Sequence, residues 1–576
     1  MTLNKRTAIV LMLLVSMLAG VTGILAQEEH TVLNVNWSTE PPSIDPSLPS
    51  DLLSIQIIEE LFVGLGRRNE LTLENEPGMA TWEVADDGLT YTFTIMQDIP
   101  WVHYNADTDA VEEVLDPDGN VRYVDANDFA YGILRTLDPA TAGPYAYVLN
   151  IAVAGGKEYN TANLDEISEE DLAALRDAVG VTVIDDYTLE IVAPSQAAFV
   201  DDILGLWMAV AQPAWLIEAE GDFWTEPEVM QSYGPYALKE WLHDESLTLI
   251  ANPFWPGTDA VPVPQIKEVH GVMLTDASAS FANYEAGMLD VVGAPMQEMD
   301  RIKADAELQE ELFTGPDYGT YYYGFNHNRP PMDNVHIRRA LSYAIDRQSL
   351  IDNVTKGGQE PAHWFSRPGL LAAPTMETHP DLGVRYDPDK ALEELQLGLE
   401  ELGLADVSEL PPITLSHNES EGHARIAEAI AQMWADELGI EVLITTQEWK
   451  VFIANIKNGE GTQVFRSSWF MDYADASNFL YDFFHADATG TGRVHWNNEV
   501  DGLNEEFNAL VEEALTLDDT EARRELYAQA EQILVVDEAV IIPIYWYTTV
   551  SLSKPYLNRT HSLIGNERYE KWSFNE

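Results

Sequence analysis

The chain has 576 residues, of which 46% are hydrophobic and 22% charged, a composition typical of a folded protein of about three to four domains. It contains no cysteine, which excludes disulfides, thiolate metal sites and thiol nucleophiles. Its formal charge of −66 argues against nucleic acid and anionic membranes as partners, because such a surface repels polyanions.

The acidity itself has two interpretations. It could serve the capture of cationic ligands, or it could keep the protein soluble in a salty exterior, where screening makes the charge tolerable. The acids are spread along the whole chain and are not clustered. We therefore favour solubility as the reason for the charge.

The amino terminus carries the pattern of a secretory signal peptide. Two basic residues, Lys5 and Arg6, precede an apolar run that ends at Ala26. We predict that residues 1–26 direct export, to the periplasm or the outer face of the cell membrane, with a retained signal acting as an anchor as the alternative. Val21 stands where a bacterial lipoprotein would carry its lipidated cysteine, which excludes a lipid anchor through that position.

The first half of the chain is rich in strand and hairpin signals. Alternating polarity between turn residues predicts strands or hairpins at 31–37, 82–95, 181–192, 234–251 and 266–273. Apolar residues at helical spacing predict helices at 52–62, 125–137 and 277–289. The acidic segment 116–120 is predicted to be a turn, because the downstream glutamate of a calcium loop is not at the required spacing.

In the second half, predicted helices and strands alternate. The strands are at 321–325, 413–416, 440–445 and 541–547. The helices are at 337–345, 426–438, 503–515 and 520–535. This βαβ order predicts an α/β lobe with some parallel pairing.

One stretch, 465–484 (FRSSWFMDYADASNFLYDFF), places Asp472 and Asp475 in the densest aromatic and apolar run after the signal. An ionised carboxylate in such surroundings is costly unless it is paired, hydrogen-bonded or protonated. The positive group of a ligand could supply the partner. Considered alone, the stretch favours two solvent-facing or helix-capping acids, since most aspartates are exposed.

No catalytic or cofactor motif accompanies this stretch. The chain has no nucleophile elbow, P-loop, dinucleotide fingerprint or zinc-spaced histidine pair. His327 and His336 are too far apart in sequence to share a helix face, and acid pairs such as Asp201 and Asp202 arise by chance among 97 acids. We predict no catalytic residue, no metal and no cofactor.

Seven segments, in order, resemble the dipeptide/oligopeptide-binding family of extracellular solute-binding proteins (family 5), the receptor components of ABC importers. They are 42–46 (PSIDP), 80–93 (ATWEVADDGLTYTF), 233–241 (YGPYALKEW), 251–253 (ANP), 324–326 (GFN), 338–347 (RRALSYAIDR) and 472–480 (DYADASNFL). Together they span almost all of the chain after the signal. The resemblance implies a ligand enclosed between two lobes.

The fold that the resemblance implies is α/β, a two-lobed periplasmic-binding-protein-like fold with a hinge. The first lobe would be discontinuous and would carry an additional α+β domain. Carried onto this sequence, the first lobe is 27–60, 194–297 and 536–576, the additional domain is 61–193, and the second lobe is 298–535.

The resemblance also implies a binding site. Peptide-binding members meet the ligand's α-ammonium group with the aspartate of a W-x-x-D pattern, which here is Trp469-Phe470-Met471-Asp472. Thr39 and Glu40 would lie opposite on the first lobe, although the prolines that follow lack the N–H groups that pair with a peptide main chain. Asp475 then becomes a helix cap.

The resemblance implies a monomeric, non-enzymatic receptor that encloses an oligopeptide or dipeptide and delivers it to ABC transporter permease subunits. One alternative keeps the fold and replaces the peptide by an oligosaccharide or another small solute. A secreted hydrolase is a third hypothesis, and it would need a nucleophile or an acid pair in the cleft.

Overall fold

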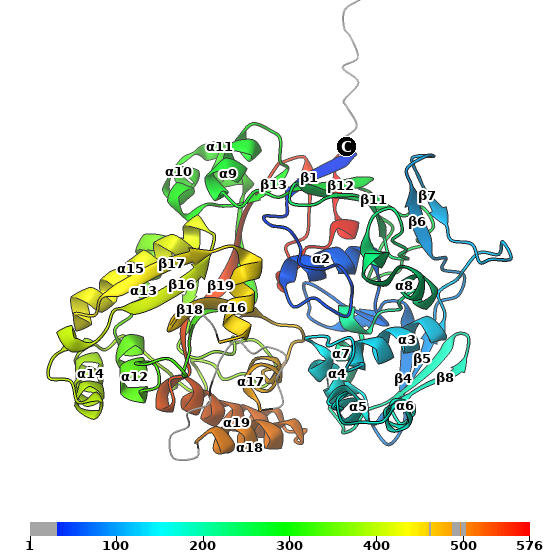
Figure 1. Cartoon of the computed structure of the whole chain (residues 1–576). Coiled ribbons are helices and arrows are strands. Elements are labelled where there is room, and N and C mark those ends of the chain that lie inside the picture. The colour runs from blue at the N-terminus through cyan, green and yellow to red at the C-terminus, as the bar shows by residue number, and fades with distance from the viewer. Residues whose placement is uncertain (1–30, 198, 460–461, 487–495, 497–502, 576) are drawn as a thin grey trace, which may run out of the picture.

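The structure, a computed structural model, describes residues 31–575 except 198, 460–461, 487–495 and 497–502. Within these residues the chain forms two lobes with two long strands running between them (Figure 1). The predicted signal peptide lies outside the described residues. In the part that is described, no helix is both long and apolar enough to cross a membrane.

The first lobe is built on a four-stranded sheet that brings the start of the chain beside residues more than two hundred positions away. Its strands, in spatial order, are β1 (Val32–Asn36), β12 (Glu268–Val272), β11 (Ser246–Ala251) and β10 (Tyr236–Leu242). β1 is parallel to β12, and the other neighbours are antiparallel. Gly271 is required here, since a Cβ atom would come within 1.7 Å of the Trp37 ring.

A second antiparallel sheet belongs to the region predicted as the additional domain. Its order is β4 (Ala80–Val84), β5 (Thr90–Ile95), β9 (Thr188–Val192) and β8 (Val181–Asp185). The two predicted hairpins, around residues 87–88 and 185–186, are both confirmed by the strand pairing. Smaller pairs are β2 (Gly66–Arg68) with β3 (Asn75–Pro77), and β6 (Val102–Asn105) with β7 (Ala110–Glu113).

Helices surround these two sheets. They are α2 (Leu52–Leu61), α3 (Ala126–Leu137), α4 (Ala146–Ala152), α5 (Gly156–Asn160), α6 (Glu169–Asp177), α7 (Val200–Leu204) and α8 (Ala214–Glu220). The next helix, α9 (Ala277–Glu285), packs instead against β13 (Val291–Gly293) of the larger sheet. The predicted helix at 125–137 begins where expected, because Asp125 and Asp128 form a reciprocal capping box.

The second lobe is built on a larger sheet. Its order is β13 (Val291–Gly293), β19 (Ile541–Ser553), β14 (Leu312–Phe325), β18 (Val464–Phe470), β16 (Ile413–Asn418) and β17 (Val442–Gln447), with β15 (Glu360–Pro361) beside β19. β16 is parallel to both β17 and β18. The parallel pairing predicted from the βαβ order is therefore confirmed.

Helices cover this sheet as well. They are α10 (Met299–Ala304), α11 (Ala306–Glu311), α12 (Val335–Tyr343), α13 (Arg347–Leu350), α14 (Pro388–Leu402), α15 (Glu421–Leu438), α16 (Trp449–Lys457), α17 (Ser477–Phe484), α18 (Leu503–Leu515) and α19 (Thr520–Gln532). Two short strands, β20 (Leu557–Asn558) and β21 (Ser573–Phe574), close the chain.

Strands β14 and β19 are longer than predicted and run side by side along the middle of the molecule (Figure 1). The sequence predicted only 321–325 and 541–547, because residues such as 312–316 are at most half-buried and lack an apolar pattern. Pairing places 541–553 in the larger sheet, although we expected the chain to return to the first lobe at 536. The domain boundaries themselves remain predictions.

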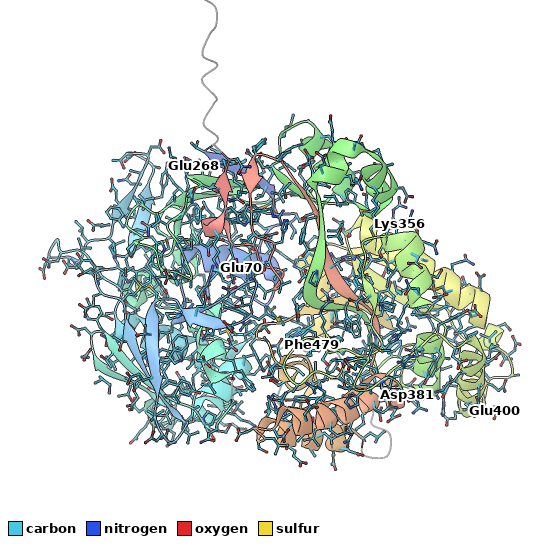
Figure 2. The ribbon with its side chains drawn as sticks, turned by 180° about the vertical axis from the view of Figure 1, so that it is seen from behind. Glu70, Glu268, Lys356, Asp381, Glu400 and Phe479 are labelled. Carbon is cyan, nitrogen blue, oxygen red and sulfur yellow. The ribbon has the colours of Figure 1, made fainter. Side chains whose placement is uncertain are left out.

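The core of the second lobe is aromatic and holds α17 in place. The Phe365 ring lies 5.2 Å from Phe479 and 5.7 Å from Phe483, both on α17. Figure 2 shows Phe479 near the centre of the molecule, whereas Lys356 and Glu400 lie toward its rim. Because α17 is anchored by buried rings, the loop that precedes it has a defined position.

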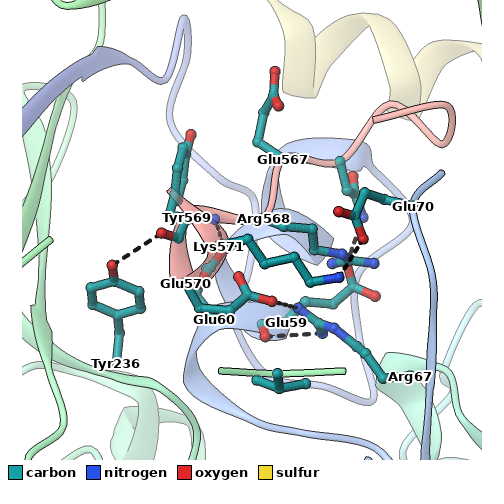
Figure 3. Close-up of polar contacts among 12 residues, drawn as sticks. Glu59, Glu60, Arg67, Glu70, Tyr236, Glu567, Arg568, Tyr569, Glu570 and Lys571 are labelled. Carbon is teal, nitrogen blue, oxygen red and sulfur yellow. Dashed lines mark hydrogen bonds and ion pairs between the residues drawn. The ribbon is translucent and has the colours of Figure 1, made fainter. Parts of the chain in front are cut away.

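A cluster of charged side chains ties the end of the chain to α2 (Figure 3). Arg568 Nη1 lies 2.6 Å from Glu59 Oε2, and Arg67 Nη2 lies 3.1 Å from Glu570 Oε1. Burial alone would raise the pKa of Glu59, but Arg568 and Arg67 outweigh it and lower that pKa to about 2. The pairs therefore stabilise the folded first lobe at neutral pH.

We expect Arg568→Met to lower the free energy of unfolding of the first lobe by about 3–5 kcal/mol, because it leaves the Glu59 carboxylate buried without its cation. Urea denaturation at pH 7 measures this. The folded-state pKa of Glu59 is depressed, so its contribution is present above pH 4.5 and is lost as the pH falls toward 2. The variant should lose this acid dependence, whereas Arg176→Met, at an exposed position of α6, should match wild type. An equal loss of stability in both variants would contradict the prediction.

Candidate ligand-binding site

Three cavities lie in a row between the two lobes. The Thr39 cavity, of about 300 Å³, is lined by Thr39, Asn418, His423 and Trp449 among others. The Arg466 cavity, of about 130 Å³, is lined by residues that include Leu52, Tyr145, Trp449, Arg466, Trp469, Phe470 and Asp472. The Arg68 cavity, of about 50 Å³, is lined by residues that include Leu52, Arg67, Arg68, Asp202, Phe470, Asp472 and Arg568. Trp449 joins the first two cavities, and Asp472 joins the last two.

Asp472 follows the end of β18 and precedes α17, at the wall between two of these cavities. Its carboxylate accepts a hydrogen bond from Asn478 Nδ2 at 3.0 Å, and its own N–H donates to Asn478 Oδ1 at 3.0 Å. Asn478 Oδ1 also accepts from Trp469 Nε1 at 3.1 Å. One amide side chain on α17 therefore orients both the predicted anion and the predicted aromatic wall. The sequence offered no signal for this role of Asn478.

The other residues of the W-x-x-D pattern also line the cavities. Trp469 lies nearly parallel to Tyr145 across the interlobe boundary, with ring centroids 6.4 Å apart. Phe470 packs on Tyr547 at 4.7 Å, and Met471 is buried at the wall of the Arg68 cavity. Gly319 pairs with Phe470 on β14, where a Cβ atom would meet the Phe470 ring at 2.5 Å.

The two residues predicted on the first lobe separate in the structure. Thr39 lines the Thr39 cavity, and its N–H donates to Trp37 O at 2.8 Å, so that donor is already used within the loop. Glu40 is buried and accepts hydrogen bonds from His243 Nδ1 at 2.7 Å and from the Asp244 N–H at 2.9 Å. Among the described residues, Glu40 lines none of the three cavities. Its carboxylate is hydrogen-bonded to the turn between β10 and β11 instead.

Asp475 is the second acid of the stretch and has a partner of its own. Its carboxylate accepts from the Ser477 N–H at 2.9 Å, but the N-cap position of α17 is Ala476, so Asp475 lies one residue before the position that the predicted cap required. It also accepts from Arg523 Nη2 at 2.7 Å, a contact that the sequence could not reveal. Burial raises the pKa of Asp475, while Arg523 opposes this effect. The charge of Asp475 is therefore balanced by Arg523 inside the second lobe.

Arg466 on β18 is a site residue that the sequence did not single out. Its side chain is buried, with Nη1 donating to Asn418 Oδ1 at 3.3 Å and Nη2 to Tyr547 OH at 3.0 Å. The guanidinium also lies 5.0 Å from the Tyr321 ring centroid. Within the described residues, no carboxylate lies within 4 Å of it. A buried guanidinium without an anion is unfavourable, so this position favours an anionic group of a ligand.

His423, at the start of α15, contributes a neutral polar group next to Arg466. Burial, and then the positive charge of Arg466, hold the pKa of His423 well below its ordinary value of 6.5. Its Nδ1 atom lies 3.3 Å from Tyr321 OH, and the ring lines the Thr39 cavity. At neutral pH this imidazole can donate or accept a hydrogen bond without adding charge.

Family membership follows from comparison with known proteins. The family described as "Bacterial extracellular solute-binding proteins, family 5 Middle" matches residues 74–491. The chain belongs to this family of solute-binding proteins.

Several curated relatives are similar over nearly their whole length. The chain is 33% identical to the oligopeptide-binding protein OppA of Bacillus subtilis, covering 90% of this chain and 88% of that protein. It is 30% identical to the dipeptide-binding protein DppE of Bacillus subtilis, with the same two coverages. It is also 30% identical to the periplasmic murein peptide-binding protein MppA of Escherichia coli, covering 93% and 90%.

Solved structures bear on the arrangement of the lobes. The structure of Escherichia coli MppA, a murein tripeptide binding protein, superposes with a TM-score of 0.79 at 27% identity, covering 96% of this chain and 100% of that chain. The structure of Haemophilus influenzae OppA in complex with RPPGFSPFR superposes with a TM-score of 0.78 at 25% identity, covering 95% of this chain and 100% of that chain. The unliganded open form of MppA superposes with a TM-score of only 0.61 at 27% identity, covering 95% of this chain and 98% of that chain. The lobes of this chain are thus arranged more as in the peptide complex than as in that open form.

An aromatic contact beside Asp472 holds this arrangement. Phe199, just before α7, stacks on Tyr473 with ring centroids 4.8 Å apart and an interplanar angle of 22°. Both side chains are buried. Because Tyr473 follows Asp472 directly, the contact connects the loop that carries Asp472 in the second lobe to the first lobe.

We expect Phe199→Leu to open the lobes, because it keeps an apolar side chain at this position but removes a stacking contact of about 0.5–1.5 kcal/mol. The closed fraction relative to the open one should fall about 2–12-fold, which small-angle X-ray scattering would record as a larger radius of gyration. Phe93→Leu is the matched control, since Phe93 stacks on Tyr91 within a single sheet. A Phe199→Leu protein no larger than wild type would contradict the prediction.

Proposed function

We propose that this protein is an exported, non-catalytic receptor that encloses a peptide between its two lobes and delivers it to an ABC transporter permease. The observation that carries the proposal is the pair of opposite charges, Asp472 and Arg466, that line one interlobe cavity. A peptide carries an ammonium group at one end and a carboxylate at the other, so one ligand can pair with Asp472 and Arg466 at the same time. The names of the relatives, which bind oligopeptides, dipeptides and murein peptide, support the same ligand class.

Asp472 is the proposed partner of the α-ammonium group. Asn478 fixes its carboxylate, so little side-chain entropy is lost when a ligand binds. Trp469 and Tyr145 cover the cavity and exclude water once the lobes are together. A charge pair in such a low-dielectric site gains more than it would in water.

Arg466 is the proposed partner of the peptide's carboxylate, with His423 beside it as a neutral hydrogen-bonding group. A neutral oligosaccharide, the alternative ligand class, would leave the Arg466 guanidinium buried without an anion. The charges of the site therefore favour a peptide over a sugar. The Thr39 cavity extends the site beyond Arg466 on the side away from Asp472.

We expect Asp472→Asn to weaken the binding of a free tripeptide at pH 7 by about 2–5 kcal/mol, because the bound ammonium loses its counter-charge. Isothermal titration calorimetry measures the change. The same peptide with an acetylated amino terminus should bind wild type and variant with similar affinities. An unchanged affinity for the free peptide would contradict the role of Asp472, and a wild type that binds no peptide would contradict the function.

We expect Arg466→Met to weaken the same free tripeptide by a similar 2–5 kcal/mol, since the apolar side chain fills the space and removes the cation. The same tripeptide with an amidated carboxy terminus tests which group of the ligand Arg466 contacts. This amide should bind wild type and variant about equally. If the variant weakened the amide as strongly as the free acid, Arg466 would act through packing and not through the peptide's carboxylate.

A further inference from the structure

The Arg68 cavity lies on the opposite side of Asp472 from Arg466. It shares Leu52, Phe470 and Asp472 with the Arg466 cavity, so a group bound at Asp472 faces both. Its volume of about 50 Å³ exceeds what one water molecule needs, and it is too small for a large side chain. It therefore fits the end of a short or medium side chain.

Two of the three arginines that line this cavity already have carboxylate partners. Arg568 pairs with Glu59 at 2.6 Å, and Arg67 pairs with Glu570 at 3.1 Å (Figure 3). These pairs form part of the wall that joins α2 to the end of the chain. The third arginine, Arg68, also faces a carboxylate, that of Asp202, but at a longer distance than in these two pairs.

Arg68 on β2 and Asp202 on α7 face each other without a hydrogen bond. The Arg68 side chain is 7% exposed, and its Nη2 lies 3.6 Å from Asp202 Oδ1, beyond hydrogen-bond distance. Arg68 Nε, Arg68 Nη2 and Asp202 Oδ1 have no hydrogen-bond partner in the described part of the chain. Burial raises the pKa of Asp202 to about 6 although Arg68 opposes it, so the carboxylate is mostly ionised at pH 7. The wall of the cavity thus contains an Arg68 donor and an Asp202 acceptor that lie close together, neither of which makes a hydrogen bond within the described residues.

We propose that the Arg68 cavity receives the first side chain of the bound peptide and selects a carboxamide, that of glutamine or asparagine. The proposal rests on the function proposed above, in which Asp472 binds the ammonium group of that same residue. A carboxamide oxygen accepts from Arg68 while its NH₂ donates to Asp202, and the group adds no net charge.

Other side chains match the cavity less well. A carboxylate would meet Arg68 but would also face the acids Asp202 and Asp472. A cationic side chain would meet Asp202 but would face Arg67, Arg68 and Arg568. An aliphatic side chain would bury the unmatched donor and acceptor without satisfying either, which costs more than exposing them.

Calorimetry with four tripeptides, X-Ala-Ala with X as Gln, Glu, Lys or Leu, tests the proposal on the wild-type protein. Gln-Ala-Ala should bind about tenfold or more tightly than Leu-Ala-Ala, and more tightly than the Glu and Lys peptides. The same four residues at the third position should not reproduce this order. Equal binding of the Gln and Leu peptides would overturn the subsite, and tighter binding of Glu or Lys would overturn the carboxamide preference. Binding of none of the peptides would overturn the proposed function instead.

A double variant, Arg68→Met with Asp202→Leu, tests the residues. Replacing both partners by apolar groups leaves no unpaired charge, so the protein should fold and Leu-Ala-Ala should still bind. The preference for Gln over Leu should shrink to about twofold or less. Asp201→Asn is the matched control, because Asp201 is the adjacent acid on α7 and does not line the cavity, and it should keep the wild-type preference. A double variant with the full wild-type preference would overturn the assignment.

Discussion

The antiparallel pairing of β14 with β19 is the constraint on which the arrangement of this protein depends. The two strands run between the lobes, and β18 lies on the other side of β14. Trp469 and Phe470 pair with Thr320 and Gly319, next to the irregularity where β14 departs from regular pairing with β19. Asp472 follows immediately. The proposed binding residues are therefore positioned by the same strands that run between the lobes, and a change in the angle between the lobes acts directly on them.

The partners of buried charged side chains differ between the interior of a lobe and the proposed site. Several buried charges within a lobe are paired with an opposite charge, as with Asp475 and Arg523 or Glu59 and Arg568. Between the lobes, Arg466 is buried with hydroxyl, amide and aromatic neighbours instead of a carboxylate. Such a residue is better explained by a ligand than by stability.

The chain shares its fold with its relatives but differs from them at most positions. At about a third identity or less, the chain is similar to OppA and MppA over nearly their whole length and has the fold of MppA. The relatives include a probable deoxycholate-binding protein and a heme-binding protein, so the family fold accommodates different ligands. Ligand choice must then depend on individual side chains in the interlobe cavities. Arg68 and Asp202 are such side chains in this protein.

The sequence alone determined the local elements and one site residue. Hairpins, helix starts and the parallel β16–β17 pairing were predictable because turn residues, capping residues and apolar periodicity act over a few positions. The resemblance to the peptide-binding family, through its W-x-x-D pattern, is what singled out Asp472 as the proposed site residue. Only the tertiary structure decided that Asp475 pairs with Arg523 and that Glu40 is buried within the first lobe. It also decided that Arg466 is surrounded by hydroxyl, amide and aromatic groups, with no carboxylate paired to it among the described residues. Those outcomes depend on partners that lie tens to hundreds of residues away, which no local pattern records.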